Sequence, residues 1–208
     1  MINIEELLHT LPTTAISDAL AGTTNLNAAI NPLMDHYHIA GRAITVRLPI
    51  GENGALLEAI RIAQPGAILV VDAKGDTNRA VAGDFVVSLM KGMDIQGLVV
   101  DGVIRDIQAI RDLDFPVFSL GTTVAAGNKF GGGVIQVPIA VGGMSIQPGD
   151  FIIGDADGVV VIPQAQVNEV VQKALKKIEK DEVRAQSVAG GKEEIIAYLD
   201  QALGNAKV

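Results

Sequence analysis

The sequence contains no cysteine and no tryptophan, and aromatic residues make up only 3% of its 208 positions. Without cysteine, the chain can form no disulfide, no thiolate metal site and no cysteine nucleophile. Basic residues are also few, since 16 Lys and Arg stand against 24 Asp and Glu and give a formal net charge of −8. Nucleic-acid surfaces need clustered bases and stacking aromatics, so we expect no nucleic-acid partner.

Long apolar runs are missing as well. No segment approaches the length of a transmembrane helix, and the first residues, MINIEELLHTL, carry acids where a secretory signal would carry bases. We therefore predict a cytoplasmic protein with no membrane partner. What the chain does have is 49% hydrophobic residues and 23 glycines. These predict a sizeable aliphatic core and many tight turns.

The middle of the chain alternates between strand and helix patterns. Strands are predicted at residues 67–73, 96–102 and 116–121, and helices at 79–94 and 103–113, the first of them firm from residue 84. This alternation predicts a parallel sheet with crossover helices. In the first of these helices, an inner face is predicted for five apolar residues at i, i+4 spacing: Phe85, Leu89, Met93, Val86 and Met90.

The flanking segments complete the predicted fold. Helices are predicted at residues 4–11, 14–21 and 54–64, and a strand at 39–49. After residue 122, short β segments separated by Gly and Pro turns predict antiparallel hairpins stacked on the parallel unit. An amphipathic helix then follows Pro163, and a last helix runs to about Leu203. The fold class is α/β: we predict one catalytic domain over residues 1–163. Residues 164–208 are predicted to be a helical extension that packs on the same domain or on a neighbouring subunit.

Asp84 stands at the predicted start of a helix, directly after Gly83. One interpretation is that Asp84 only caps this helix, because Asp is a good N-cap residue. The other is that the free amides of Phe85 and Val86 at the helix start bind the oxygens of a carboxylate or phosphate. The local sequence leaves both interpretations open.

Arg105 and Asp106 follow the strand that ends at Asp101-Gly102. They could form an ordinary surface ion pair. Alternatively, Arg105 could bind a carboxylate or a developing oxyanion through its planar fork, and Asp106 could be an oxygen ligand of Mg²⁺ or Mn²⁺. Both strand-to-helix transitions, at Asp84 and at Arg105, lie at the carboxyl end of a parallel sheet, where ligands usually bind. This convergence favours a site.

Other motifs are weaker candidates. His36 and His38 could contact a metal, but no third ligand stands near them, so a loop leading into a strand is preferred. The GDADG segment at residues 154–158 lacks the later ligands of a calcium loop and is predicted to be a turn. Lys129 lies in GNKFGGGV, which matches no nucleotide-binding motif, and nothing near it predicts the lowered pKa of a Schiff-base lysine.

Several segments resemble one known family along nearly the whole chain: TTAISDAL, AGRAITV, VVDGVIRD, PVFSLG, IQPGD and DADGVVVIP. The family contains the 4-hydroxy-4-methyl-2-oxoglutarate/4-carboxy-4-hydroxy-2-oxoadipate aldolases and the regulator of ribonuclease E activity A. Its aldolase signature is an Asp, twenty residues, Arg-Asp, two residues and an acid. Asp84, Arg105 and Asp106 match that spacing, whereas Ala109 stands where the last acid is expected.

The resemblance implies a fold, a reaction and roles for these residues. The implied fold is an α-β-β-α swivelling sandwich assembled as a homotrimer or hexamer. The implied reaction is metal-dependent retro-aldol cleavage of a 4-hydroxy-2-keto acid to pyruvate, with oxaloacetate decarboxylation as a second activity. Asp106 would hold Mg²⁺ or Mn²⁺, Arg105 would bind the keto oxygen, and Asp84 would orient or deprotonate a water. The amides of Phe85 and Val86 would hold the carboxylate of the substrate.

The same resemblance leaves a second hypothesis open. The regulator branch of the family implies a non-enzymatic ring that binds a partner protein such as a ribonuclease. Asp84, Arg105 and Asp106 favour the lyase, and Ala109 keeps the binding protein under consideration.

Overall fold

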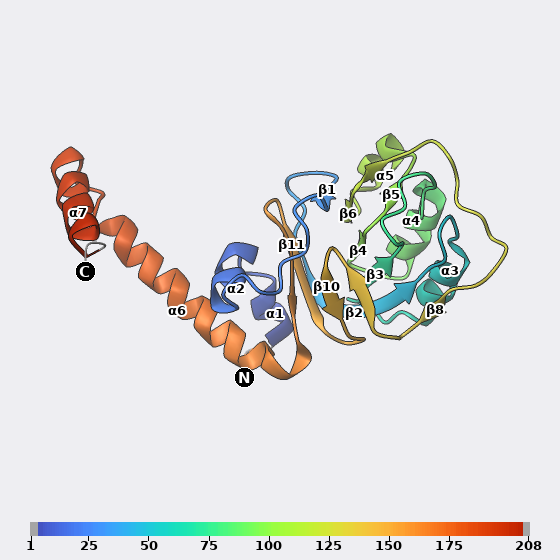
Figure 1. The fold of residues 1–208 in the computed structure, drawn as a ribbon, viewed down its shortest axis with the longest axis horizontal. Helices are drawn as coiled ribbons and strands as arrows, with labels where there is room; N and C mark the ends of the chain where they lie inside the picture. Colours follow the sequence, from blue (N-terminus) through green and yellow to red (C-terminus); the bar gives the residue numbers. More distant parts are fainter. Residues whose placement is uncertain (1–3, 206–208) are drawn as a thin grey trace.

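The computed structural model describes residues 4–205. Four parallel strands form the centre of the main sheet (Figure 1). In spatial order they are β6 (Val117–Ser119), β4 (Gly97–Val100), β3 (Ile68–Asp72) and β2 (Ile39–Arg47). Helix α4 (Asp84–Gly92) connects β3 to β4, and α5 (Ile107–Leu113) lies between β4 and β6. The predicted parallel sheet with crossover helices is therefore confirmed.

Antiparallel strands extend this sheet at both ends. β1 (Asn31–Pro32) pairs with β6, and β11 (Phe151–Asp155) pairs with β2 and with β12 (Gly158–Ile162). β8 (Val134–Ile135) pairs with the end of β2. The prediction that all hairpins stack on the parallel unit is wrong for β11 and β12. The reason is the length of β2, whose residues 39–42 pair with β11 while residues 43–47 pair with β3.

Both faces of the parallel strands are buried. Leu69 and Val71 of β3 face a layer of helices made of α3 (Gly54–Ile62), α4 and α5. Ile68 and Val70 face the opposite side, where the hairpin of β9 (Ile139–Val141) and β10 (Met144–Ile146) packs. Burial on both faces explains why these strands are continuous apolar runs rather than alternating ones. These layers are what the structure shows, and the swivelling α-β-β-α description stays a prediction from the resemblance.

A third apolar cluster joins the two ends of the chain. Helices α1 (Ile4–Leu8) and α2 (Thr13–Ala19) pack with the first half of α6 (Val167–Gln186) against β11 and β12. The second half of α6 extends away from the sheet and carries α7 (Lys192–Asn205) at its far end (Figure 1). The side chains of α7 are exposed at every position from 192 to 204. No helix in the described part of the chain is both long enough and apolar enough to span a membrane.

Two helix predictions need correction. Residues 103 and 104 are not helical: they form β5 (Val103–Ile104), which pairs with β7 (Gly121–Thr122), and α5 begins only at Ile107. In α4 the inner face consists of Val86, Val87 and Met90. Three apolar residues predicted to face inward are instead partly or largely exposed: Phe85 (67%), Leu89 (38%) and Met93 (40%).

Candidate active site

Main-chain pairing brings the start of α4 beside the start of α5. The amide of Val81 donates to the carbonyl of Val103 (2.8 Å), and the amide of Arg105 donates to the carbonyl of Ala82 (3.1 Å). Residues 81–82 therefore run alongside 103–105, so the residues that follow each segment lie close together. A Cβ atom added to Gly83 would collide with Oδ2 of Asp106 and would lie 3.1 Å from Nε of Arg105. The absence of a side chain at Gly83 makes this close approach feasible.

Arg105 and Asp106 form an ion pair at the turn between β5 and α5. Nε of Arg105 lies 3.2 Å from Oδ2 of Asp106, and each side chain is about two-fifths exposed (40% and 38%). Asp106 has left-handed backbone angles (φ 57°, ψ 38°), a conformation that Asp tolerates better than most residues. This turn ends the strand and presents both side chains at the surface, where they can contact a ligand.

Asp84 is the first residue of α4, and Gly83 occupies the N-cap position. Oδ1 of Asp84 accepts a hydrogen bond from the amide of Phe85 (2.7 Å). The prediction that both helix-start amides are free is therefore wrong for Phe85. The amide of Val86 has no hydrogen-bond partner among residues 4–205, and it remains available to an anion, favoured by the positive end of the helix dipole.

A pocket of about 130 Å³ opens between these elements. It is lined by Gly83, Asp84, Phe85, Val86 and Arg105, together with Asn53, Ala80, Ala82, Ala126, Gly127 and Lys129. The sequence prediction missed Asn53 and gave Lys129 no role. Two cations, Arg105 and Lys129, line the same small pocket as the free amide of Val86. This arrangement suits a small carboxylate-bearing molecule.

Asn53 stands at the N-cap of α3, and its side chain is buried within the wall of this pocket. Its Nδ2 donates to the carbonyl of Val81 (3.2 Å), and its main-chain amide donates to the carbonyl of Asn128. Oδ1 of Asn53 is buried without a partner in the described structure. In the sequence, an Asn before a helix is typical of an N-cap, so no local signal distinguishes a pocket-lining Asn53 from an Asn that only caps the helix.

Two more open hollows share Asp84 with this pocket. One, of about 660 Å³, is lined by Asp84, Arg105, Asp106, Ile107, Gln108 and Ala109. The other, of about 370 Å³, is lined by Asp84, Phe85, Ser88, Ala109, Asp112 and Leu113. Ala109 lines both. Where the family signature has an acid, this chain therefore has a methyl group facing open space.

The carboxylates fit a hard cation that keeps most of its waters. No group of three or more His, Asp or Glu side chains within residues 4–205 is arranged to enclose a metal. Asp106 is partly exposed and Asp84 is near it, and Mg²⁺ is commonly held by one or two carboxylates plus water. His36 instead contacts Asp114 (Nε2 to Oδ1, 2.8 Å). His36 therefore contacts a carboxylate and belongs to no group of three or more potential metal ligands within residues 4–205.

Asp101 directly follows β4, and its side chain stabilises the fold. Its Oδ1 accepts a hydrogen bond from the amide of Ala73 (2.6 Å), and it lines none of the pockets around Asp84. Burial raises the pKa of Asp101 to about 6, opposed by the bond from Ala73 and helped by the nearby charge of Asp72. Asp101 therefore ties the turn after β3 to the end of β4.

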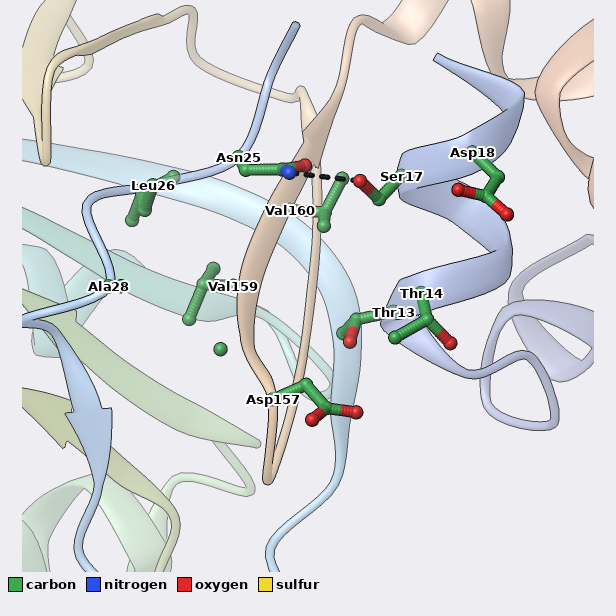
Figure 2. Close-up of a pocket in the computed structure, with 11 residues that line it drawn as sticks. Thr13, Thr14, Ser17, Asp18, Asn25, Leu26, Ala28, Asp157, Val159 and Val160 are labelled. Atoms are coloured by element: carbon green, nitrogen blue, oxygen red, sulfur yellow. Dashed lines mark hydrogen bonds between the residues drawn. The ribbon is translucent and has the colours of Figure 1, made fainter. Parts of the chain in front are cut away.

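A separate pocket of about 260 Å³ lies between α2 and β12 (Figure 2). Asp18 and Asp157 belong to its wall, and its lining includes no Lys, Arg or His. Nδ2 of Asn25 already donates to Oγ of Ser17 (2.9 Å). The acidic wall of this pocket is therefore poorly suited to an anionic ligand, and the pocket lined by Arg105 is the better candidate.

Comparison with known proteins identifies the family of this chain. A family model described as RraA-like, Aldolase/RraA, matches residues 13–161. The chain belongs to the RraA-like family. It is 51% identical over 195 residues to a protein of Halalkalibacterium halodurans named "Putative 4-hydroxy-4-methyl-2-oxoglutarate aldolase", and the match covers 94% of this chain and 93% of that one.

Solved structures from the same family share the fold of this RraA-like chain. Streptomyces coelicolor RraAS2, described as an unusual member of the RNase ES inhibitor RraA protein family, has a TM-score of 0.81 at 28% identity and covers 89% of this chain and 98% of its own. The RNA-processing inhibitor RraA from Thermus thermophilis has a TM-score of 0.68 at 27% identity, with 73% and 92% covered. Among the relatives of this chain, one is named as an aldolase and two are described as inhibitors or members of an inhibitor family.

Proposed function

We propose that this RraA-like protein is a divalent-metal-dependent lyase that cleaves a 4-hydroxy-2-keto acid to pyruvate by a retro-aldol reaction, with oxaloacetate decarboxylation as a second activity. The observation that carries the proposal is the convergence of Asp84, Arg105 and Asp106 at the start of α4 and α5, around two pockets that share Asp84 and Arg105. The aldolase name of the 51% identical relative supports the reaction class.

In this proposal the pocket of about 130 Å³ holds the pyruvate half of the substrate. The amide of Val86 and the cations of Arg105 and Lys129 bind the carboxylate and keto oxygens. As the bond between C3 and C4 breaks, its electron pair moves to C3 and negative charge develops on the keto oxygen. Arg105 stabilises that charge, which is the interaction that usually contributes most to such a step.

Proton transfer is assigned to Asp84. It lines the pyruvate pocket and both open hollows, so it can orient a water against C3 or against the hydroxyl at C4. The hydroxyl proton leaves as C4 becomes a carbonyl, and the enolate then takes a proton at C3 to give pyruvate.

Asp106, assisted by Asp84, would hold the Mg²⁺ or Mn²⁺ ion. When bound, such an ion supplies positive charge that stabilises the enolate and orients the keto acid. The ion pair with Asp106 would keep the guanidinium of Arg105 next to the place where the enolate oxygen forms.

The test is pyruvate release from 4-hydroxy-2-keto acids and from oxaloacetate, with Mg²⁺ or with excess chelator. Asp106→Ala should abolish metal-dependent turnover, and Arg105→Lys should lower kcat by at least about a hundredfold because the planar fork is lost. Asp94→Asn is the control, since it removes an exposed carboxylate at the other end of α4. Metal-independent turnover, or equal activity in Asp106→Ala, would refute the proposal.

The second candidate is a non-enzymatic regulator that binds a ribonuclease. The likeness to the Thermus and Streptomyces RraA structures favours it. The regulator role predicts inhibition of a ribonuclease that is unchanged in Asp106→Ala, together with no turnover above the background of the metal alone. The lyase role predicts the opposite pair of results.

A further inference from the structure

The last helix, α7, has an apolar side that no residue between 4 and 205 covers. This side consists of Ile195, Ile196, Leu199 and Leu203, and all four side chains are exposed. A helix of only 14 residues is marginal on its own in water and gains most of its stability by packing its apolar side. Because α7 stands at the far end of the arm formed by α6 (Figure 1), we expect its partner surface to lie outside its own chain.

A second uncovered apolar stripe lies on α4. Phe85, Leu89 and Met93 are spaced four residues apart, so they share one side of the helix, and all three are exposed. Next to this stripe is the hollow of about 370 Å³ between α4 and α5, whose apolar walls are Phe85, Ala109 and Leu113. The stripe and the hollow together form a surface that we call the α4–α5 groove.

The two surfaces match in length and in shape. The stripe of α4 runs over eight residues from Phe85 to Met93, and that of α7 runs over eight residues from Ile195 to Leu203. At 1.5 Å per residue, each is about 12 Å long. A Cβ atom at Gly92 would have nothing within 4 Å, and Ala109 has only a methyl group, so a second helix can approach the groove closely.

The charges of the two surfaces are complementary as well. Asp112 lines the hollow and accepts a hydrogen bond from Nε2 of Gln108 (3.1 Å), but it forms no ion pair in the described part of the chain. Lys192 is the single cation of α7, and it also lacks an ion pair there. Lys192 lies in line with Ile196 and Leu199, at i+4 and i+7. A helix that places its apolar side in the groove therefore brings an unpaired cation to an unpaired acid.

The two surfaces cannot meet within one chain. α7 and the helices α4 and α5 lie at opposite ends of the long axis of the molecule (Figure 1). A second copy of the chain supplies the groove that α7 needs and has the same need itself. Such a contact is returned by the partner in a pair or passed on around a closed ring, and either arrangement covers every copy of both surfaces.

We infer that α7 of one copy binds in the α4–α5 groove of a second copy, with Lys192 against Asp112. The contact fills the smaller hollow, and it leaves open the pocket of about 130 Å³ and the larger hollow around Arg105. The inference goes beyond the proposed reaction and does not depend on it, because an inactive chain would assemble in the same way.

Cross-linking tests the contact directly. The chain has no cysteine, so introduced thiols report the contact without interference. Leu199→Cys and Leu89→Cys chains are produced together in one cell, purified and treated with a short bismaleimide. We expect a cross-linked pair of chains on a denaturing gel from this mixture, and none from either variant alone. Gln201→Cys is the matched control: it lies on the opposite side of α7, so together with Leu89→Cys it should give no cross-link.

Charge reversal tests the position of Lys192. Lys192→Glu in the chain that carries Leu199→Cys should lower the rate of cross-linking about fivefold or more, because it places like charges together. Asp112→Lys in the chain that carries Leu89→Cys should restore most of that rate. All five changes are at the surface, so the Tm of each variant should stay close to that of the wild type.

Three results would count against the inference. A cross-link in Leu199→Cys alone would show that α7 pairs with α7. No cross-link in the mixture, or an equal one with Gln201→Cys, would show that α7 does not bind in the groove. Failure of Asp112→Lys to restore the rate would overturn the pairing of Lys192 with Asp112. None of these results affects the lyase, which is tested by pyruvate release.

Discussion

Substituting Gly83 by alanine tests whether the position of the Arg105–Asp106 pair matters for catalysis. Gly83 has ordinary extended angles (φ −126°, ψ −174°), so alanine meets no backbone strain there. The new Cβ would collide with Oδ2 of Asp106 and would lie 3.1 Å from Nε and 3.2 Å from Cγ of Arg105. These are atoms of partly exposed side chains, which can move without disturbing the core.

The expected result is a large loss of activity with a small loss of stability. Alanine is a poorer N-cap than glycine, which costs about 0.5 kcal/mol. Displacing two functional side chains by roughly 1 Å lowers the rate by about a hundredfold, which corresponds to roughly 2.7 kcal/mol in transition-state free energy. The measurement pairs kcat/KM for metal-dependent pyruvate release with the free energy of unfolding from urea titration.

Gly92→Ala is the matched control, because a Cβ at Gly92 in the same helix has nothing within 4 Å. Its activity should equal that of the wild type, and its stability should be unchanged or raised by a few tenths of a kcal/mol, about the helix propensity gained. Full activity in Gly83→Ala would refute the claim that this tight contact positions the pair. A loss of stability as large as the loss of activity would point to unfolding instead.

Three other substitutions test the framework around the site. Asp101→Asn removes a carboxyl group whose pKa is raised to about 6 in the folded protein, so the folded state binds the carboxyl proton more tightly than the unfolded chain does. As the pH rises from 5 to 7.5, the wild type should therefore lose about 1 kcal/mol of stability relative to the variant, measured by urea titration at each pH. Asn53→Ala leaves the carbonyl of Val81 without its side-chain donor and should cost about 1–2 kcal/mol in the same assay. Gly154→Ala places a Cβ 2.9 Å from Cζ of the Phe118 ring and should lower stability by about 1–3 kcal/mol, seen as a lower Tm; an unchanged Tm would show that the core yields there.

The parallel core and the site it carries were predictable from local patterns. Continuous apolar runs such as residues 67–73 indicate strands buried on both faces, and the carboxyl ends of parallel strands bring Asp84 and Arg105 to one edge. The pattern in α4 was ambiguous, because two adjacent stripes are both apolar and periodicity alone does not tell which stripe contacts the sheet. The stripe of Phe85 faces outward.

Features that depend on long-range pairing could not be predicted. Residues 103–104 have helical spacing, yet they form a strand because Gly121 and Thr122 lie alongside them. Asn53 reaches the pocket through a bridge between Glu52 and Asn128, two positions far apart in a chain region with no periodic pattern. Lys129 is also far in sequence from Asp84 and Asn53, so its place in the lining of the same pocket could not be predicted either.

The main-chain pairing under the site has a consequence for substitutions there. Ala80 donates to the carbonyl of Ala125 (2.8 Å) and accepts from the amide of Gly127 (3.0 Å), while Val81 and Arg105 make the bonds that join the two helix starts. These bonds use backbone atoms alone, so substitutions at positions 84, 106 or 109 leave the frame in place. The frame therefore does not depend on the side chains at these positions, and relatives with an aldolase name and with an inhibitor name share this fold.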